Sequence, residues 1–514
     1  MQNTVLKYLE ETAQKYPDKD AIVDKNEKIS FKEFRKRAIL IGKTIQLKIN
    51  RIHKPILVYL PKSIDSIVSF MGVLYSGNFY TPTDVNFPFD KVKGIINCLE
   101  PSLFITNREY STKLIKNGIC EEKLLILEDV EADVEKTELL FLNDIVDTDV
   151  VYVLFTSGST GVPKGVVISN RSIIDYIDWA KKCYDINSND SIGNQAPFYF
   201  DNSTLDIYLM ISTGATLYII PENLFSFPVK LMNYICENEI DTIFWVPSVY
   251  INVANADILS TINAVCLKKI LFAGEVMPNK HLNYWRKHIP NALYSNLYGP
   301  TEITVDCTYY IVNRNFKDEE PLPIGIPCTN SNVMLLNDRN QLIQAQDEMG
   351  ELCVRGSSLA LGYWNNLDKT NEVFVQNPLN HMYPEKIYRT GDLAHYNEYG
   401  ELMFDGRRDF QIKHMGYRIE LGEIETAVLG INEIGEACVI YDKDKRDIVL
   451  YYSGEDAIDK KLIRKELMQR IPKYMIPTKF MRKKVLPKND NGKIDRKELE
   501  KDYALKKEEE HFGL

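Results

Sequence analysis

The segment LFTSGSTGVPKGVV, residues 154–167, decides how the rest of this sequence is interpreted. It follows the apolar run VVYVLF, which predicts a buried strand, and it holds three glycines, four hydroxyl side chains and one lysine. Glycines let the backbone curl around an anion, while hydroxyls and an ammonium group add donors and positive charge. The segment therefore predicts a polyphosphate-binding loop made of Thr156, Ser157, Gly158, Ser159, Thr160, Gly161 and Lys164.

Taken alone, such a loop has a plain alternative, which is a mobile serine- and glycine-rich loop without a function. The loop also departs from the GxxxxGK[ST] pattern of Walker-type NTPases, because valine follows the Lys164–Gly165 pair. A Walker-type site is therefore disfavoured, and the meaning of the loop depends on the rest of the chain.

The composition is that of a globular protein large enough for two or more domains, with 514 residues, 45% hydrophobic and 26% charged. A formal net charge of -10 gives no basic field for nucleic acid, and no apolar run is long enough to insert into a membrane. Nine cysteines without a CxxC pair predict reduced thiols and a cytoplasmic protein. Seven histidines without ligand-like spacing argue against a zinc site.

Short apolar runs alternate with segments of helical periodicity through the first four hundred residues. KPILVYL, VVYVLF and KKILFAGE predict buried strands, and NRSIIDYIDWAKKCY predicts a helix. This alternation predicts βαβ units and largely parallel sheets, which is an α/β fold. Glycine-punctuated strands near residue 350 predict a small β module. We therefore predict a large N-terminal domain over residues 1–408 and a small, mobile α+β C-terminal domain over residues 409–514.

Four further motifs give the loop its context: NLYGPTE (296–302), YRTGDLA (388–394), GRRDFQIKHMGYRIELGEIE (406–425) and LPKNDNGKIDR (486–496). Together with the loop, and in the same order, they resemble the adenylate-forming superfamily from about residue 5 to residue 500. The resemblance is to amino-acid adenylating enzymes, both the adenylation domains of nonribosomal peptide synthetases and the D-alanine–carrier protein ligases. It implies an AMP-forming ligase that activates an amino acid with ATP and passes it to a phosphopantetheine thiol.

The same resemblance assigns the remaining nucleotide-binding residues. It places Tyr298 against the adenine, with Gly274 and Glu275 completing that pocket. It places Asp392 on the two ribose hydroxyls, since a carboxylate can accept two hydrogen bonds, and Arg407 near the ribose and phosphates.

Two catalytic residues and a metal follow from the NLYGPTE motif. The resemblance implies that Thr301 contacts the α-phosphate and that Glu302 helps to hold Mg²⁺, an ion that prefers carboxylate and phosphate oxygens. We therefore expect ATP and Mg²⁺ as cofactors.

The small C-terminal domain is expected to supply the principal catalytic residue, Lys493. A lysine in a lysine-rich tail is by itself most simply a solvated surface residue, but here it lies in the family's closing motif. The resemblance implies that its ammonium group bridges the substrate carboxylate and the α-phosphate. Asp409 matches the hinge about which the small domain turns between adenylation and thiolation, which presents residues 416–418 to the carrier arm.

The amino-acid pocket is assigned by the same motif alignment. Asp201 stands where amino-acid adenylating enzymes keep a carboxylate for the substrate's α-ammonium group, and its alternative is a turn or N-cap aspartate. The other assigned pocket residues are Asn202, Leu205, Trp245, Leu271, Ala273, Leu297, Val305 and Asp306. Trp245 is bulky and is expected to make the pocket shallow, which favours a small side chain.

D-Alanine is the first candidate substrate, because several phrases such as LFAGEVMP are closer to D-alanine–carrier protein ligases. Two residues depart from that pattern: Ala273 replaces a cysteine, and Asp306 replaces a small apolar residue. The acidic Asp306 suggests a polar or cationic substrate side chain, unless it points away or pairs with a neighbour.

The chain carries no carrier-like sequence after residue 500, so we expect a separate phosphopantetheinylated carrier protein and a monomeric ligase. A domain excised from a peptide synthetase with a polar or basic substrate is the alternative. An acyl- or aryl-CoA ligase is disfavoured by Asp201, and a non-catalytic nucleotide-binding relative is disfavoured by the presence of Lys493, Glu302, Asp392 and Arg407.

Overall fold

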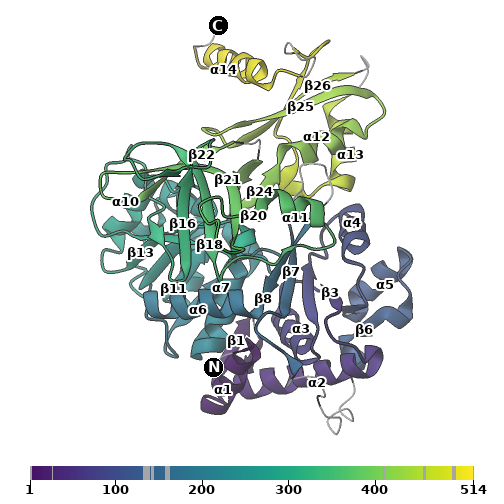
Figure 1. Cartoon of the computed structure of the whole chain (residues 1–514). Coiled ribbons are helices and arrows are strands. Elements are labelled where there is room, and N and C mark those ends of the chain that lie inside the picture. Colours follow the sequence, from purple (N-terminus) through teal and green to yellow (C-terminus); the bar gives the residue numbers. More distant parts are fainter. Residues whose placement is uncertain are drawn as a thin grey trace. The chain divides into compact units, whose positions relative to one another are not determined.

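The computed structural model of this chain describes residues 3–25, 27–130, 139, 144–156, 163–408, 411–454, 459–488 and 494–512 (Figure 1). By their mutual contacts the residues form two units. The first comprises Met1–Val85, Leu99–Phe155 and Gly165–Arg408, and the second comprises Asn86–Cys98, Thr156–Lys164 and Asp409–Leu514.

A nine-stranded sheet runs through the first unit in the order β15-β14-β13-β12-β11-β9-β10-β1-β2. Its strands are β1 (Asp20–Asp24), β2 (Glu27–Ser30), β9 (Ser191–Asn194), β10 (Thr216–Ile219), β11 (Thr242–Trp245), β12 (Lys269–Phe272), β13 (Leu293–Tyr298), β14 (Thr308–Ile311) and β15 (Ile326–Pro327). The central strands from β13 to β1 pair in parallel, and the outer strands β14, β15 and β2 pair antiparallel. The carboxyl ends of the parallel strands therefore lie along one edge of the sheet.

A seven-stranded sheet has the order β19-β8-β7-β4-β3-β5-β6, and it is parallel from β7 to β6. Its strands are β3 (Pro55–Tyr59), β4 (Phe79–Thr83), β5 (Leu103–Thr106), β6 (Leu124–Ile126), β7 (Val150–Thr156), β8 (Lys164–Ser169) and β19 (Gly362–Tyr363). The apolar runs that predicted buried strands form β3, β7 and β12, which confirms the α/β prediction.

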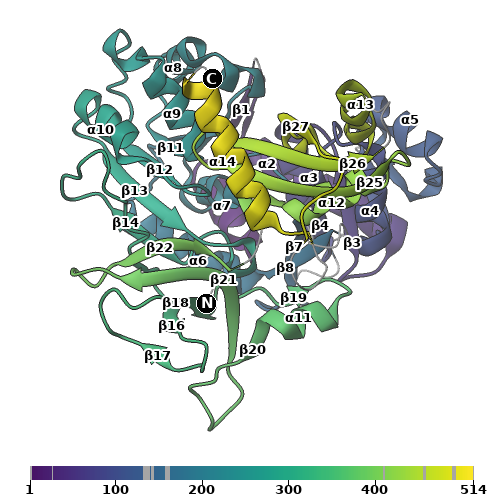
Figure 2. The same cartoon turned by 90° about the horizontal axis from the view of Figure 1, so that it is seen from above.

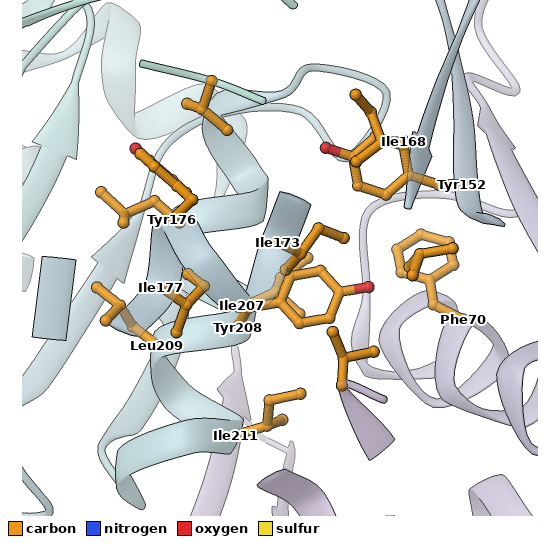
Figure 3. Packing of buried hydrophobic residues seen from close by; sticks show 14 of the residues in the cluster. Phe70, Tyr152, Ile168, Ile173, Tyr176, Ile177, Ile207, Tyr208, Leu209 and Ile211 are labelled. Atoms are coloured by element: carbon orange, nitrogen blue, oxygen red, sulfur yellow. The ribbon is translucent and has the colours of Figure 1, made fainter. Parts of the chain in front are cut away.

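The helices of the first unit connect and cover these sheets. They are α1 (Leu6–Lys15), α2 (Phe31–Ile49), α3 (Ile64–Tyr75), α5 (Arg108–Lys116), α6 (Asn170–Cys183), α7 (Asn202–Thr213), α8 (Pro228–Glu237), α9 (Pro247–Asn255), α10 (Asn279–His288) and α11 (Leu367–Val373). One buried cluster joins α6 and α7 to residues of both parallel sheets (Figure 3). A second cluster packs α8, α9 and α10 on the other face of the nine-stranded sheet.

The predicted β module is an antiparallel sheet of β17 (Leu342–Ile343), β16 (Ser331–Leu336), β18 (Gly350–Gly356), β21 (Lys386–Tyr396) and β20 (Phe374–Gln376), with β22 (Leu402–Arg407) paired to β21 (Figure 2). Short antiparallel strands joined by tight turns explain the frequent glycines in this part of the sequence.

The second unit contains an antiparallel pair, a three-stranded sheet and four helices of the described chain. Its elements are α4 (Phe89–Leu99), β23 (Gln411–His414), β24 (Tyr417–Glu420), α12 (Leu421–Leu429), β25 (Ile434–Asp442), β26 (Asp447–Gly454), α13 (Lys460–Arg470), β27 (Lys479–Arg482) and α14 (Arg496–Phe512). Helix α14 lies along β25 (Figure 2). A hydrophobic cluster of its own fills this unit. None of the helices in the described ranges is long and apolar enough to cross a membrane.

Two glycines allow helices α2 and α3 to pack closely. A Cβ atom on Gly72 of α3 would lie 2.7 Å from the Cβ of Ile41 and 3.1 Å from the carbonyl oxygen of Ala38. A Cβ atom on Gly42 of α2 would lie 2.9 Å from the carbonyl oxygen of Gly72. Neither helix backbone can move aside without disturbing the buried cluster beneath it.

We predict that Gly72→Ala destabilises the protein by about 1–2 kcal/mol, although alanine is the better helix former by about 1 kcal/mol, because overpacking costs more. Gly94→Ala in α4 is the matched control, since its Cβ would meet nothing closer than 3.6 Å. That variant should be neutral or slightly more stable. The midpoint of urea unfolding measures both variants, and equal midpoints would contradict the close packing.

Candidate functional site

Three of the predicted nucleotide-binding side chains meet in the first unit. Tyr298 is the last residue of β13, while Asp392 and Arg407 stand opposite each other on β21 and β22. The Tyr298 hydroxyl donates to Asp392 Oδ2, and Arg407 Nη1 lies 2.6 Å from Asp392 Oδ1. The structure therefore brings together residues that are far apart in the sequence, since Tyr298 and Asp392 are separated by 94 positions.

This group is almost closed to solvent. Tyr298 is 6% exposed and Asp392 is 4% exposed. Burial, together with the Asp392 carboxylate, raises the pKa of the Tyr298 phenol well above its usual value, so the hydroxyl stays a hydrogen-bond donor. The Asp392 carboxylate is thus held in a fixed orientation by one neutral and one cationic donor.

The turn between β13 and β14 is strained where it carries the predicted catalytic residues. Thr301 and Glu302 lie in the 3-10 turn Thr301–Ile303, and the two residues after that turn, Thr304 and Val305, have φ angles of 60° and 70°. A positive φ is a true outlier for a β-branched residue. The strain has a cause in packing, because a Cβ on Gly299 would lie 2.5 Å from the Cα of Asp306. Backbone strain of this kind persists where the surrounding structure enforces it, and it is common at functional sites.

Glu302, the predicted metal ligand, is fully buried. Its Oε1 accepts a hydrogen bond of 2.7 Å from the hydroxyl of Tyr363 in β19. Sequence reasoning had no signal for Tyr363, because it lies 61 residues from Glu302 in a segment without a motif. Together the two residues present an anchored oxygen ligand beside Thr301, which is 9% exposed.

The predicted phosphate loop is described only at its two ends. Ser157, Gly158, Ser159, Thr160 and Gly161 lie outside the described residues, as do Asp409 and Lys493. At the ends of the loop, the Thr156 hydroxyl donates to the Lys164 carbonyl oxygen at 3.5 Å. Lys164 Nζ, in turn, lies 3.7 Å from Glu420 Oε1 within the second unit. A phosphate bound by Lys164 would therefore take the place of a carboxylate that the lysine already pairs with.

Asp201 directly precedes helix α7 and makes no capping hydrogen bond to it through its side chain. Its backbone is already helical, with φ -62° and ψ -29°, which differs from the extended conformation of a true N-cap residue. The N-cap interpretation of Asp201 thus lacks a side-chain hydrogen bond to the helix, but the residue does lie in the turn before α7, so its role in substrate binding stays a prediction. The helix N-terminus beside it still favours a negatively charged carboxylate.

The predicted side-chain pocket is divided between two buried clusters. Leu205, Leu271, Ala273, Leu297 and Val305 belong to the cluster that contains α6 and α7. Trp245 belongs to the cluster on the opposite face of the sheet. Its indole N–H donates to the Gly193 carbonyl oxygen at 2.9 Å, and its ring packs between Phe225 and Tyr250. That Trp245 limits the depth of the pocket therefore stays a prediction.

The remaining predicted residues occupy the same edge of the nine-stranded sheet. Gly274 follows β12 with φ +91°, a conformation that glycine adopts without cost. Glu275 accepts the Ser248 backbone N–H at 3.1 Å with Oε2, at the start of helix α9. Asn202 is 8% exposed, and its Nδ2 has no hydrogen-bond partner among the described residues. Asp306 is buried and accepts a hydrogen bond from Tyr176.

A polar cluster on the segments that flank Asp201 in the sequence was not predicted. Lys62, which follows β3 of the seven-stranded sheet, donates to the carbonyl oxygen of Gln195 at 2.9 Å, just after β9 of the nine-stranded sheet. Asn194 Nδ2 donates to Asp206 Oδ2 at 2.8 Å. The lysine thus ties the two sheets together at the segment that leads to Asp201. A lone lysine and a lone aspartate carry no pattern by which sequence reasoning could have found them.

Comparisons with known proteins match nearly the whole chain. The sequence profile of the family described as AMP-binding enzyme matches residues 9–364. The D-alanine–D-alanyl carrier protein ligase of Bacillus cytotoxicus is 32% identical over 507 residues, which cover 96% of this chain and 98% of the ligase. Tyrocidine synthase 1 of Brevibacillus parabrevis is 32% identical over 493 residues, 95% of this chain and 44% of the synthase.

The solved structures agree with the fold. The Vibrio cholerae adenylation domain AlmE, solved with glycyl-adenosine-5'-phosphate, superposes with a TM-score of 0.85 at 20% identity and covers 98% of both chains. The present chain spans 44% of the length of tyrocidine synthase 1 and 14% of the length of tyrocidine synthase 2.

The Lys62 cluster gives a prediction about stability and pH. Burial raises the pKa of Asp206 to about 7, whereas burial lowers the pKa of Lys62 to about 8. The folded chain therefore holds a proton on Asp206 between about pH 4 and pH 7 that the unfolded chain loses. Because the folded state binds more protons there, the free energy of unfolding decreases as the pH rises through this range.

As the pH rises through this range, the free energy of unfolding of Asp206→Asn should fall less than that of the parent protein. We predict a difference on the order of 2–4 kcal/mol, since the amide does not titrate. Urea unfolding of both proteins at pH 5 and pH 7.5 measures it. Parallel pH profiles for the two proteins would show that Asp206 titrates normally.

Proposed function

Because this chain belongs to the family of AMP-binding enzymes, we propose that it activates an amino acid with ATP and transfers the aminoacyl group to a carrier protein. Two observations support this proposal: the arrangement of side chains around Asp392, and the similarity to a D-alanine–carrier protein ligase over nearly the whole of both chains. A small amino acid is the proposed substrate, with D-alanine the first candidate. The proposed acceptor is the phosphopantetheine thiol of a separate carrier protein, and the proposed location is the cytoplasm.

In the first half-reaction a carboxylate oxygen of the amino acid attacks the α-phosphorus of ATP. An oxygen–phosphorus bond forms, the bond to the β-phosphate oxygen breaks, and pyrophosphate leaves. Asp392 would hold the ribose hydroxyls, while Arg407 stays paired with it and faces the same region. Thr301 would contact the α-phosphate, and Asp201 would bind the α-ammonium group. Positioning and electrostatics account for most of such catalysis.

Mg²⁺ is proposed at Glu302. The donor set fits, because the Glu302 carboxylate is buried, anchored by Tyr363 and made of hard oxygen atoms. The described residues contain no group of three acidic, histidine or cysteine side chains that could hold a metal alone. Mg²⁺ is commonly held by one or two carboxylates plus substrate phosphates, so a single glutamate suffices. The ion would offset the negative charge of the phosphates.

In the second half-reaction the thiol of the carrier arm loses its proton and attacks the acyl carbonyl carbon. A thioester forms and AMP leaves. Lys493 is proposed to act only in the first half-reaction, and Asp409 is proposed as the hinge that removes it for the second.

Amino-acid-dependent ATP–pyrophosphate exchange against a panel of acids tests the proposed function. We predict exchange led by a small amino acid, with no exchange for fatty or aryl acids. We further predict that Asp201→Asn raises the KM for the amino acid about 100-fold and changes the KM for ATP little, because a charged partner of the α-ammonium group is lost. Asp178→Asn, whose carboxylate accepts from Tyr8 on the surface of α6, is the control and should behave as the parent.

If Asp201→Asn affected both KM values equally, Asp201 would have no special role in amino-acid binding. Exchange only with non-amino acids would favour an acyl- or aryl-CoA ligase. Exchange led by a basic amino acid would favour a peptide-synthetase-type substrate. A folded protein that binds ATP and shows no exchange would favour the non-catalytic interpretation.

We also predict that Lys493→Ala lowers pyrophosphate exchange by about 100-fold or more, because negative charge develops on the α-phosphate without its ammonium partner. Transfer of the aminoacyl group from chemically prepared aminoacyl-AMP to the carrier thiol should change less than threefold. An equal loss in both half-reactions would contradict a role confined to adenylation.

A further inference from the structure

Asp392 stands at an irregular point of the β module. Where β18 and β21 pair, the single residue Leu352 of β18 lies opposite three residues of β21, residues 390–392. On its other side β21 pairs with β22, and there Asp392 is in register with Arg407. A bulge of this kind re-aims a side chain of its strand, and here it carries the residue that is proposed to bind the ribose.

Two backbone N–H groups of the bulge are bound by side chains. The Asp392 N–H donates to Thr390 Oγ1 at 2.9 Å, and the Thr390 hydroxyl donates in turn to the Leu352 carbonyl oxygen at 2.7 Å. The Gly391 N–H donates to Glu351 Oε1 at 3.2 Å. Because a buried backbone N–H without an acceptor is costly, these bonds help to fix the shape of the bulge.

Glu351, from β18, also binds two arginines, and it is 6% exposed. Its Oε2 accepts from Arg389 Nε at 3.0 Å and from Arg389 Nη2 at 2.8 Å, and Arg408 Nη1 lies 3.7 Å from the same oxygen. Since both cations face Oε2, Oε1 is left to accept from Gly391. The backbone N–H of Arg408 donates to the Gly391 carbonyl oxygen at 2.9 Å, so this glycine is bound at both of its backbone polar groups.

We propose that Glu351 is a positioning residue for ATP: its carboxylate holds the bulge of β21 in the shape that aims Asp392 at the ribose, and so sets the preference for a nucleotide with both ribose hydroxyls. The residue acts through Gly391 and does not itself touch the nucleotide. This role rests on the proposed function, which assigns the ribose to Asp392.

Glutamine at position 351 has nearly the same size but cannot accept from both Gly391 and Arg389. If its amide oxygen accepts from Gly391, its NH2 group faces the Arg389 guanidinium. If the amide is turned around, the NH2 group faces the Gly391 N–H. A donor meets a donor in both orientations, because an amide has one acceptor oxygen and a carboxylate has two. Glu351→Gln therefore loosens the bulge without leaving a cavity.

The test measures the preference for the ribose hydroxyls directly, as the ratio of kcat/KM for ATP over kcat/KM for 2′-deoxy-ATP in pyrophosphate exchange. Glu351→Gln should reduce this ratio by about fivefold or more, mainly through the KM for ATP. The KM for the amino acid should stay within about twofold of the parent. A general loss of stability would lower both values of kcat/KM together and leave their ratio unchanged.

Glu385→Gln is the matched control. Glu385 directly precedes β21 and accepts from Arg355 of β18 and from Asn377 Nδ2, the latter at 2.6 Å. It is therefore a second arginine-paired glutamate at the same two strands, and none of its hydrogen-bond partners among the described residues belongs to the bulge. Glu385→Gln should leave the nucleotide ratio within about twofold of the parent.

Asp392→Ala links the effect to the ribose, because it removes the proposed acceptor and sets the lower limit of the ratio. Added to Asp392→Ala, Glu351→Gln should change the remaining ratio by less than about twofold, since two residues that act as one unit do not have additive effects. Where a variant exchanges too slowly, the dissociation constants of ATP and 2′-deoxy-ATP give the corresponding ratio.

Arg389→Gln makes the test independent of the folding of Glu351→Gln. It leaves the Glu351 carboxylate in place but removes the two guanidinium donors that fix Oε2. It should reduce the nucleotide ratio in the same direction, by about threefold. A folded Arg389→Gln variant with the ratio of the parent would contradict the inference where Glu351→Gln does not fold.

Two further results would overturn the inference. One is a folded Glu351→Gln variant whose nucleotide ratio matches that of Glu385→Gln. The other is a loss of the same factor with and without Asp392, since the effect would then not pass through that residue. A parent protein without a preference for ATP, or an Asp392→Ala variant that keeps this preference, would instead refute the proposed ribose role of Asp392. Those failures appear without any change at Glu351, so they are distinguishable from a failure of the inference.

Discussion

The close approach of Gly299 to the backbone of Val305 and Asp306 is the constraint on which the site depends. With a Cβ excluded at Gly299, the turn after β13 closes tightly, and Thr304 and Val305 are held in left-handed conformations. The hydroxyl of Thr304 fixes the turn by donating to the Ser358 carbonyl oxygen at 2.8 Å. The energy stored in this strain is offset by the packing around it.

Three side chains leave this one turn in different directions. Tyr298, before it, reaches Asp392 in the β module. Glu302, within it, is anchored by Tyr363 of β19, and Asp306, after it, is anchored by Tyr176 of α6. Each carboxylate is buried, and each is held by a tyrosine hydroxyl. Asp392 has the cationic Arg407 as a second donor, whereas the hydrogen bonds described above for Glu302 and Asp306 come from neutral hydroxyls.

Tyrocidine synthase 1 and the D-alanine–D-alanyl carrier protein ligase are both 32% identical to this chain, so overall similarity does not by itself identify the amino acid. Tyr176 and Asp306 form one buried hydrogen-bonded pair, while Lys62 donates to Gln195 and Asn194 donates to Asp206, in the segments before and after Asp201.

The sequence alone determined the α/β class, the strands β3, β7 and β12, and the family motifs that mark Tyr298, Glu302, Asp392 and Arg407. Apolar runs and glycine-rich turns are local patterns, so they predict strands and turns without knowledge of the tertiary contacts. β9 and β4 were not foreseen, because a short strand with glycine or proline carries no clear period.

Only the tertiary structure decided which groups meet. Tyr176 lies 130 residues from Asp306, and Lys62 lies 133 residues from Gln195. A single tyrosine or lysine in a helix or loop has the same local pattern whether it faces solvent or a buried carboxylate. Its role comes from the partner that the folded sheets bring within hydrogen-bond distance, and that partner is not encoded near it in the sequence.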